Sequence, residues 1–377
     1  MMKSIQAHYV MCFFLCGISY ATMSVSKAIR KPAITFHRNG GRFGDDLLSY
    51  AQAWWLAYKY DLDFFLTPFT YSEMLELHYK HPHINSDIVS KYKHTYVINR
   101  GRNFPLPVDE KGFYYSTYYC NSGINWSDET FRDAMKQYIA PHGEWHYMEL
   151  PNTMRTVAIH VRRGGGYRID SDFCRRRRPY HFPSVEYYGN SLQLLLDRYP
   201  NENFFVHIFT DDRDPAGVAQ SIKQCINLSD ESRVEFSWRM KGNNYATNVV
   251  EDFFDMTRFM YLIRPNSNMS IFAERIGDHD IVIVPRQASS GRPWGRVSVI
   301  ELRVRTPNCI EREQASISYF SGRVDSQKTT DVDQQNPVPH KQSWHYRPRR
   351  KLARRSAVVR KLLRRRLQLK QAAQSSE

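Results

Sequence analysis

Short apolar runs rich in β-branched and aromatic residues alternate along this chain with longer stretches in which apolar residues recur every three or four positions. The first pattern is typical of strands and the second of amphipathic helices. Strands are expected at residues 33–36, 64–66, 95–98, 113–119, 156–161, 204–209, 234–238 and 281–284, with a further one ending at Ile263. Helices are expected at 46–60, 128–139, 185–198 and 249–260, with Ser127 as the N-cap of the second.

Strands and helices alternate most regularly after a proline-bounded break at 141–151. Such alternation favours a parallel sheet with helices on both faces. A chain of 377 residues with 42% hydrophobic content is long enough for two such α/β cores. We therefore expect an N-terminal α/β domain at 31–150 and a Rossmann-like domain at 151–306. The pattern fades from about Pro307, which predicts a linker at 307–340.

The formal charge of +15 is concentrated at the C-terminus. Residues 341–377 hold 13 Lys and Arg against one Glu, which leaves +3 for residues 1–340. On a helical wheel the leucines and valines of this tail gather opposite most of its arginines, as in helices that lie on membranes. We therefore expect the tail to bind an anionic membrane surface, with a solvated basic extension as the alternative. Nucleic acid is not an expected partner, because residues 347–370 contain no aromatic side chain to stack on bases.

The first 30 residues form a second segment outside the expected domains. Residues 9–26 carry no charge and 10–18 are strongly apolar, with Lys3 before them and Lys27 after them. This pattern is that of a secretory signal peptide or a short signal anchor, since the apolar part falls short of the roughly 20 residues that span a bilayer. We therefore expect residues 1–30 to direct the protein to a membrane or the secretory pathway, and a location on the cytoplasmic face stays open. Four cysteines beyond this segment allow two disulfides or free thiols: Cys120, Cys174, Cys225 and Cys309.

Residues 157–164 carry the strongest chemical signal. A β-branched run leads there into His160, Arg162, Arg163 and Gly164, and because strand side chains alternate, His160 and Arg162 share one face. Guanidinium groups bind phosphate oxygens bidentately, and glycines let backbone N–H groups approach a ligand. The pattern predicts a phosphate or diphosphate site, with a strand end carrying solvated arginines as the alternative.

Two further segments each have the pattern of a strand, a turn and then a helix. One runs from the strand at 33–36 through a glycine-rich turn at 39–46, and the other from the strand ending at Ile263 through the polar turn at 264–270. Turns of this kind place helix N-termini at the carboxyl ends of strands, where nucleotides bind in open α/β sheets. The three segments together favour a nucleotide site.

The motifs resemble those of the fucosyltransferase superfamily, the GDP-fucose-dependent α1,2-, α1,6- and protein O-fucosyltransferases. "GRFGDD" at 41–46 is similar to the family's Gly-Arg-Phe-Gly-Asn turn, and "HVRRG" at 160–164 to its His-x-Arg-Arg signature. "HIFTDD" at 207–212 resembles the strand that ends in paired acids, and "NSNMS" at 266–270 resembles the Asn-Ser-Ser-Phe-Ser turn. The resemblance covers roughly residues 33 to 300, in sparse motifs.

The resemblance implies a GT-B-like fold, in which two Rossmann-like domains face a cleft. It also implies inverting transfer of fucose from GDP-fucose to a hydroxyl of a glycan or glycoconjugate, without a cofactor or an obligatory metal. Arg162 is expected to contact the donor β-phosphate. The other expected donor-binding residues are His160, Arg163, Gly164, Asp211, Asp212, Asn266, Ser267 and Ser270. Those expected on the cleft or acceptor side are Arg38, Gly41, Arg42, Gly44 and Asp45.

Asp170 is the candidate general base, because a glutamate at this spacing from the histidine has that role in the α1,6 branch; Arg162 is the other candidate catalytic residue. Gly165 stands where the family often has an acidic residue. A catalytically inactive, membrane-associated protein that binds nucleotide or glycan on the same scaffold is therefore the alternative. Asp212 and Asp214 also match an Asp-x-Asp pattern that binds Mn²⁺ in other glycosyltransferases, which leaves metal dependence as a further alternative.

Overall fold

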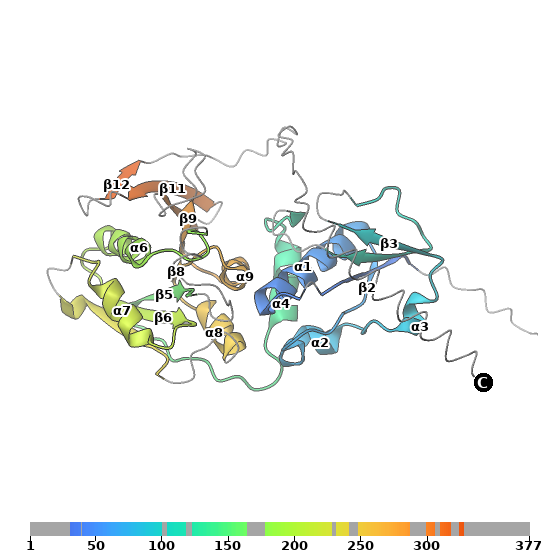
Figure 1. The fold of residues 1–377 in the computed structure, drawn as a ribbon, viewed down its shortest axis with the longest axis horizontal. Helices are drawn as coiled ribbons and strands as arrows, with labels where there is room; N and C mark the ends of the chain where they lie inside the picture. The colour runs from blue at the N-terminus through green and yellow to red at the C-terminus, as the bar shows by residue number, and fades with distance from the viewer. Residues whose placement is uncertain are drawn as a thin grey trace, which may run out of the picture. The chain divides into compact units, whose positions relative to one another are not determined.

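The computed structural model describes residues 31–38, 40–99, 104–117, 123–163, 178–227, 231–240, 248–286, 299–305, 310–317 and 324–327, which form two β-sheets with helices packed on them (Figure 1). The first sheet contains β1 (Ala33–Phe36), β2 (Asp63–Phe64), β3 (His94–Ile98) and β4 (Gly112–Ser116). Its strand order is β2-β1-β4-β3, and every pairing is parallel.

Helix α1 (Phe43–Tyr60) connects β1 to β2 and is the longest described helix of this part. Shorter helices follow: η1 (Ser72–Met74), α2 (Glu76–Lys80), α3 (Ser86–Val89) and then α4 (Glu129–Ile139). The N-cap of α4 is Asp128, whose side chain accepts a hydrogen bond from the backbone N–H of Phe131 at 3.0 Å. The N-cap predicted at Ser127 is therefore wrong by one residue, because the carboxylate of Asp128 satisfies the free N–H group.

The second sheet has a parallel part and an antiparallel part. Its parallel strands are β5 (Arg155–Val161), β6 (Phe204–Thr210), β7 (Val234–Trp238), β8 (Tyr261–Ile263) and β9 (Ile281–Arg286). Its antiparallel strands are β10 (Val299–Arg305), β11 (Ile310–Ile317) and β12 (Val324–Gln327). The order is β12-β11-β10-β9-β8-β5-β6-β7. The predicted parallel sheet is confirmed for β5 to β9, and three strands that were not predicted extend it with antiparallel pairing, so the whole sheet is mixed.

Helices cover both faces of the second sheet, as Figure 1 shows: α6 (Val185–Arg198) and α7 (Pro215–Lys223) on one face, α8 (Val249–Met256) and α9 (Asn268–Ile276) on the other. A short helix, η3 (Glu231–Arg233), precedes β7. Because side chains alternate along a strand, successive residues of β5 contact the helices on opposite faces of the sheet. Val157, Ile159 and Val161 pack in the cluster that contains residues of α6 and α7, whereas Ala158 packs in the cluster with α8 and α9. His160 follows Ala158 on the α8 and α9 face.

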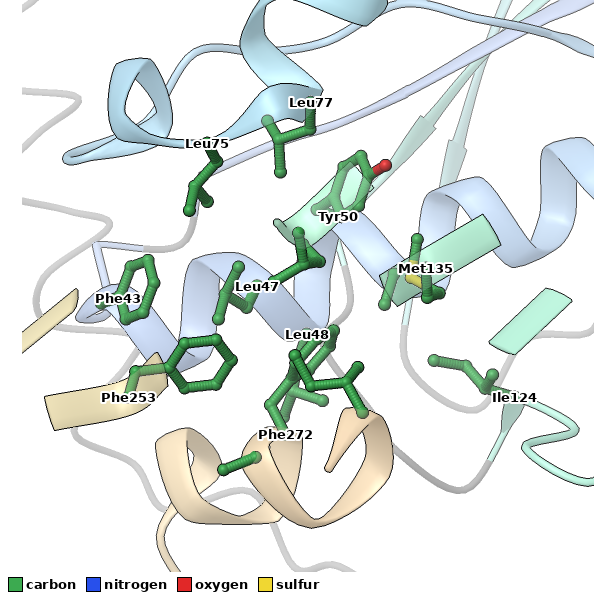
Figure 2. Close-up of a cluster of buried hydrophobic side chains, with 14 of the residues drawn as sticks. Phe43, Leu47, Leu48, Tyr50, Leu75, Leu77, Ile124, Met135, Phe253 and Phe272 are labelled. Atoms are coloured by element: carbon green, nitrogen blue, oxygen red, sulfur yellow. The ribbon is translucent and has the colours of Figure 1, made fainter. Parts of the chain in front are cut away.

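One hydrophobic core joins the helices of the two sheets. Figure 2 shows Phe43 and Leu47 of α1 beside Phe253 of α8 and near Phe272 of α9. The rings of Phe43 and Phe253 meet edge to face with their centroids 5.5 Å apart. Buried side chains from both sheets and their helices therefore belong to one hydrophobic cluster, although the two sheets are formed by residues on opposite sides of the break at 141–151. The predicted domain boundary at residue 150 stays a prediction.

The predicted linker at 307–340 is wrong for residues 310–317 and 324–327, which form β11 and β12. Both strands are held by backbone pairing, β11 to β10 and β12 to β11. Backbone pairing needs no apolar side chains, and the polar sequence of β11 therefore gave no strand signal.

The helix predicted at 249–260 ends at Met256, where the hydroxyl of Thr257 donates to the carbonyl of Phe254 at 2.7 Å.

Candidate functional site

The parallel part of the second sheet has a topological switch point between β5 and β8. From β5 the chain adds β6 and β7 on one side, then returns to add β8 and β9 on the other. Ligands of open α/β sheets bind outside the carboxyl ends of the strands at such a point. Here the flanking residues are those that follow β5, from His160 to Arg163, and those that follow β8, from Arg264 to Ser267.

His160 lies at the centre of this region with its side chain buried. Burial, together with the smaller effects of the charges of Arg162, Arg264 and Arg42, lowers the pKa of His160 to about 3. The ring is therefore neutral at any working pH. Its Nδ1 is buried, and no described residue supplies a hydrogen-bond partner to it. A buried, unpartnered polar atom costs free energy unless a ligand or water completes it.

Arg162 follows β5 directly, and its guanidinium lies over the ring of Phe182 with 5.2 Å to the ring centroid. An arginine held on an aromatic face keeps its fork oriented. Arg42 comes from the turn before α1 and Arg264 follows β8, so positive charges from three segments far apart in the sequence act on His160. The structure thus brings together Arg42, Arg162 and His160, which the sequence named, with Arg264, which it did not.

Arg163 points to the end of β6 instead. Its backbone N–H donates to Oδ1 of Asp211 at 2.6 Å, and its Nε lies 3.4 Å from Oδ2 of Asp212. Asp212 also accepts from the N–H of Asp214 at 3.0 Å, and Asp214 caps α7 by accepting from Gly217 at 2.9 Å. The paired acids therefore anchor the ends of β5 and β6 and the start of α7. Within the described ranges, no group of three or more His, Cys, Asp or Glu is arranged to hold a metal ion.

The N-termini of α1 and α9 meet at the switch point. A Cβ placed on Gly44 would lie 2.3 Å from the backbone nitrogen of Met269, so only glycine permits this approach. The side chain of Asn268 donates to Oδ1 of Asp45, whose Oδ2 accepts from the N–H of Arg42 at 3.0 Å. Both helix dipoles therefore direct their positive ends toward the same region, which favours an anion.

The turn from β8 to α9 is fixed from several sides. The N–H of Asn266 donates to the carbonyl of Tyr180 at 2.7 Å, and the carbonyl of Asn266 is paired with the ring of His181. Ser267 is the buried N-cap position of α9. Ser270 is fully buried, and its hydroxyl donates to the carbonyl of Ser267 at 3.2 Å. The hydroxyl of Ser270 thus closes the turn in this structure, and its expected role in donor binding stays a prediction.

Arg38 lies at the corresponding point of the first sheet, after β1, which has β2 on one side and β4 on the other. Its Nη2 donates to the hydroxyl of Thr70 at 3.1 Å and lies 3.6 Å from Oδ2 of Asp46. Burial raises the pKa of Asp46 to about 6, against the opposite effect of Arg38. Asp46 is a residue of this region that sequence reasoning missed as a site residue, although it stands in the turn motif. Gly41 lies in the same turn, beside the side chain of Asp45.

Gly164, Gly165 and Asp170 lie outside the described residues, as do the N-terminal segment and the basic tail. Among the helices that the structure describes, none is long and apolar enough to cross a membrane.

No family model and no curated protein matches this chain. Solved structures do. A mutant of Arabidopsis thaliana FUT1 in complex with GDP is 11% identical, with a TM-score of 0.48 over 76% of this chain and 75% of that one. The NodZ α-1,6-fucosyltransferase soaked with GDP-fucose is 14% identical, with a TM-score of 0.42 over 73% of this chain and 100% of that one. POFUT1 in complex with GDP is 13% identical, with a TM-score of 0.37 over 66% of this chain and 96% of that one.

All three similarities have a TM-score under 0.5 and an identity under 15%.

Proposed function

We propose that this chain is a glycosyltransferase that moves fucose from GDP-fucose to a hydroxyl of a glycan or glycoconjugate. The observation that carries the proposal is that the positive charges of Arg42, Arg162 and Arg264, from three separate segments, all act on buried, neutral His160 at the switch point. The N-termini of α1 and α9 add their positive ends to these charges. A diphosphate is the anion that such a concentration of guanidinium groups and helix N-termini suits best.

The reaction that this site would serve produces negative charge on a leaving group. The acceptor oxygen bonds to C1 of fucose, the bond from C1 to the β-phosphate oxygen breaks, and its electron pair leaves on GDP. Arg162 would neutralise that charge, and neutral His160 would donate a hydrogen bond without releasing a proton. Asn266, Ser267 and the first turn of α9 would hold the phosphates. Fixed guanidinium charges supply what a metal supplies in other transferases, and the proposal is therefore metal-independent.

The acceptor is proposed to bind on the side of the first sheet. Arg38 is about two-fifths exposed at the carboxyl end of β1, and Asp46 and Thr70 hold it there. The acceptor proton needs a base, for which we propose Asp170. Inversion at C1 follows from direct attack opposite the leaving diphosphate. With the two sheets each presenting a switch point, a GT-B-like arrangement of two Rossmann-like halves is the fold that we propose.

We also propose a membrane-associated or exported location. The supporting features are the uncharged N-terminal segment at 9–26 and the arginine-rich tail at 341–377. Flotation of the full chain with vesicles containing anionic lipid, with and without residues 341–377, tests the tail. Binding that survives removal of the tail would count against its proposed role.

Calorimetric titration with GDP, UDP and CMP in the presence of EDTA tests the donor site. We expect selective GDP binding that weakens at least tenfold in Arg162→Gln, since a hydrogen bond to a charged group contributes about 1.5–3 kcal/mol. Arg155→Gln is the matched control. Arg155 starts the same strand at its opposite end and also lies over an aromatic ring, that of Tyr199, at 4.1 Å. Equal loss of GDP binding in both variants, or no GDP binding by the unaltered chain, would contradict the proposed site.

A further inference from the structure

A chain of buried charges runs from β10 to the end of β8. Arg264 donates from Nε to Oε2 of Glu274 at 2.6 Å, and its Nη2 bonds to the same oxygen. The other oxygen of Glu274 accepts from Nη1 of Arg303 at 2.5 Å. Nε of Arg303 donates in turn to Oε1 of Glu301 at 2.6 Å. Arg264 is 4% exposed, Glu274 7% and Glu301 0%, so these three charges are held away from water, whereas the side chain of Arg303 is 23% exposed.

The network is charged at any working pH. Burial acts to raise the pKa of Glu274, but the opposing charges of Arg264, Arg303 and Arg275 outweigh it and lower that pKa to about 2. A guanidinium does not deprotonate, so the pairs are permanent. Each carboxylate oxygen of Glu274 serves a different arginine, which makes Glu274 the joint between β8 and β10.

Arg264, held by Glu274, in turn makes hydrogen bonds that fix the turn that follows β8. Its Nη1 donates to the carbonyl of Pro265 at 3.0 Å, and its backbone N–H donates to Ile283 of β9 at 3.0 Å. Pro265 precedes Asn266 and Ser267, the residues proposed to hold the phosphates. Arg264 is also one of the three arginines whose charge lowers the pKa of His160. The position of its guanidinium therefore sets both the turn and part of the positive field at the switch point.

We propose that Glu274 and Arg303 are positioning residues for the donor site. They hold Arg264 against the β8–α9 turn, and the antiparallel strand β10 therefore contributes indirectly to diphosphate binding. The inference rests on the proposed function. It assigns a role to a strand that lies beyond the parallel, nucleotide-binding part of the sheet, and to two residues that do not touch the donor.

Arg305 provides a matched control on the same strand. It lies two residues after Arg303, and its Nη1 and Nη2 donate to Oδ1 of Asp278 at 2.9 Å and to the carbonyl of Gly277 at 3.0 Å. Both arginines thus tie β10 to the α9 region, but only Arg303 reaches Glu274. A loss of β10 packing affects both, whereas loss of positioning affects Arg303 alone.

The experiment measures GDP affinity by calorimetry in the full chain and in Arg303→Gln, Arg303→Lys and Arg305→Gln. We expect about tenfold weaker binding in Arg303→Gln, partial recovery in Arg303→Lys, which keeps the charge but not the fork, and unchanged binding in Arg305→Gln. Hydrogen exchange of residues 264–271, followed without nucleotide, should rise in Arg303→Gln and not in Arg305→Gln.

The outcomes separate the two claims. If the unaltered chain binds GDP and both glutamine variants bind it alike, the positioning role is wrong and the proposed function stands. If exchange at 264–271 is the same in both glutamine variants, the positioning role is also wrong. If Arg303→Gln does not fold, the comparison of Arg303→Lys with Arg305→Gln decides by the same criteria. If the unaltered chain does not bind GDP, the proposed function fails and this inference with it.

Discussion

Replacement of Gly44 by alanine should separate the two helix N-termini that form the site. A Cβ at this position would lie 2.3 Å from the nitrogen and 2.7 Å from the Cα of Met269, whereas ordinary contact begins at 3.4 Å. The alanine is therefore about 1.1 Å too close, and the atoms in its way are backbone atoms of α9, which cannot rotate aside.

Overpacking of this kind costs about 1–3 kcal/mol, and obstruction by backbone favours the upper end. Alanine regains up to about 1 kcal/mol relative to glycine in a helix, so the net destabilisation should be about 2 kcal/mol. At roughly 2–4 °C per kcal/mol for a domain of this size, Tm should fall by about 4–8 °C. GDP binding should weaken as well, because Arg42 and the first turns of α1 and α9 move apart.

Thermal unfolding and GDP calorimetry of Gly44→Ala test this reasoning, with Gly123→Ala as the control. The three atoms nearest to a Cβ on Gly123 belong to the side-chain amide of Gln52, the first at 3.1 Å, and none of them is a backbone atom. We expect Gly123→Ala to change Tm and GDP affinity little. A Gly44→Ala variant with the Tm and GDP affinity of the unaltered chain would refute the close approach of α1 and α9.

Three further predictions concern charge. Below pH 6.5 the unfolded chain protonates His160, whereas the folded chain, in which the pKa of His160 is about 3, does not; the free energy of unfolding therefore falls as pH drops from about 6.5 to 3. In His160→Gln the slope of the free energy of unfolding against pH, measured by urea unfolding between pH 6 and 4, should be flatter by about 1.4 kcal/mol per pH unit. An unchanged slope would mean that His160 is not held neutral. Glu274→Ala should destabilise the fold by about 3–5 kcal/mol, because it leaves the buried Arg264 uncompensated; a loss under 1 kcal/mol in the same assay would show that Arg264 is hydrated. Removal of divalent ions with EDTA should leave GDP affinity unchanged, and restoration of affinity by Mn²⁺ alone would contradict metal-independent binding.

Several elements could be predicted from local pattern because their residues carry a clear periodicity. β1, β7 and α6 have the bounds expected from the sequence. α7 was missed, although Asp214 before Pro215 is a helix start signal, because its nine residues show too short a periodic run. β11 and β12 were missed because their pairing is made by backbone atoms of a neighbouring strand, which no local pattern reports.

The individual motifs of the candidate site could be predicted from the sequence, but the contacts between them could not. The motif at 160–163 and the turn at 266–270 could be located because strand ends and helix starts have sequence signals. The contact of Asp45 with Asn268 joins residues 223 positions apart, and nothing local encodes that distance. The partner of Arg264 could not be read either, because Glu274 looks like an ordinary helix residue until the fold buries it beside two arginines.

The most direct test of the account is turnover of GDP-fucose by the full chain, followed as GDP release with a panel of glycans, in EDTA, for the unaltered chain, Arg162→Gln and Arg155→Gln. The account predicts glycan-dependent GDP release that Arg162→Gln loses and Arg155→Gln keeps. Tight GDP binding without any release of GDP from GDP-fucose would contradict a transferase and would leave a nucleotide-binding protein on the same scaffold.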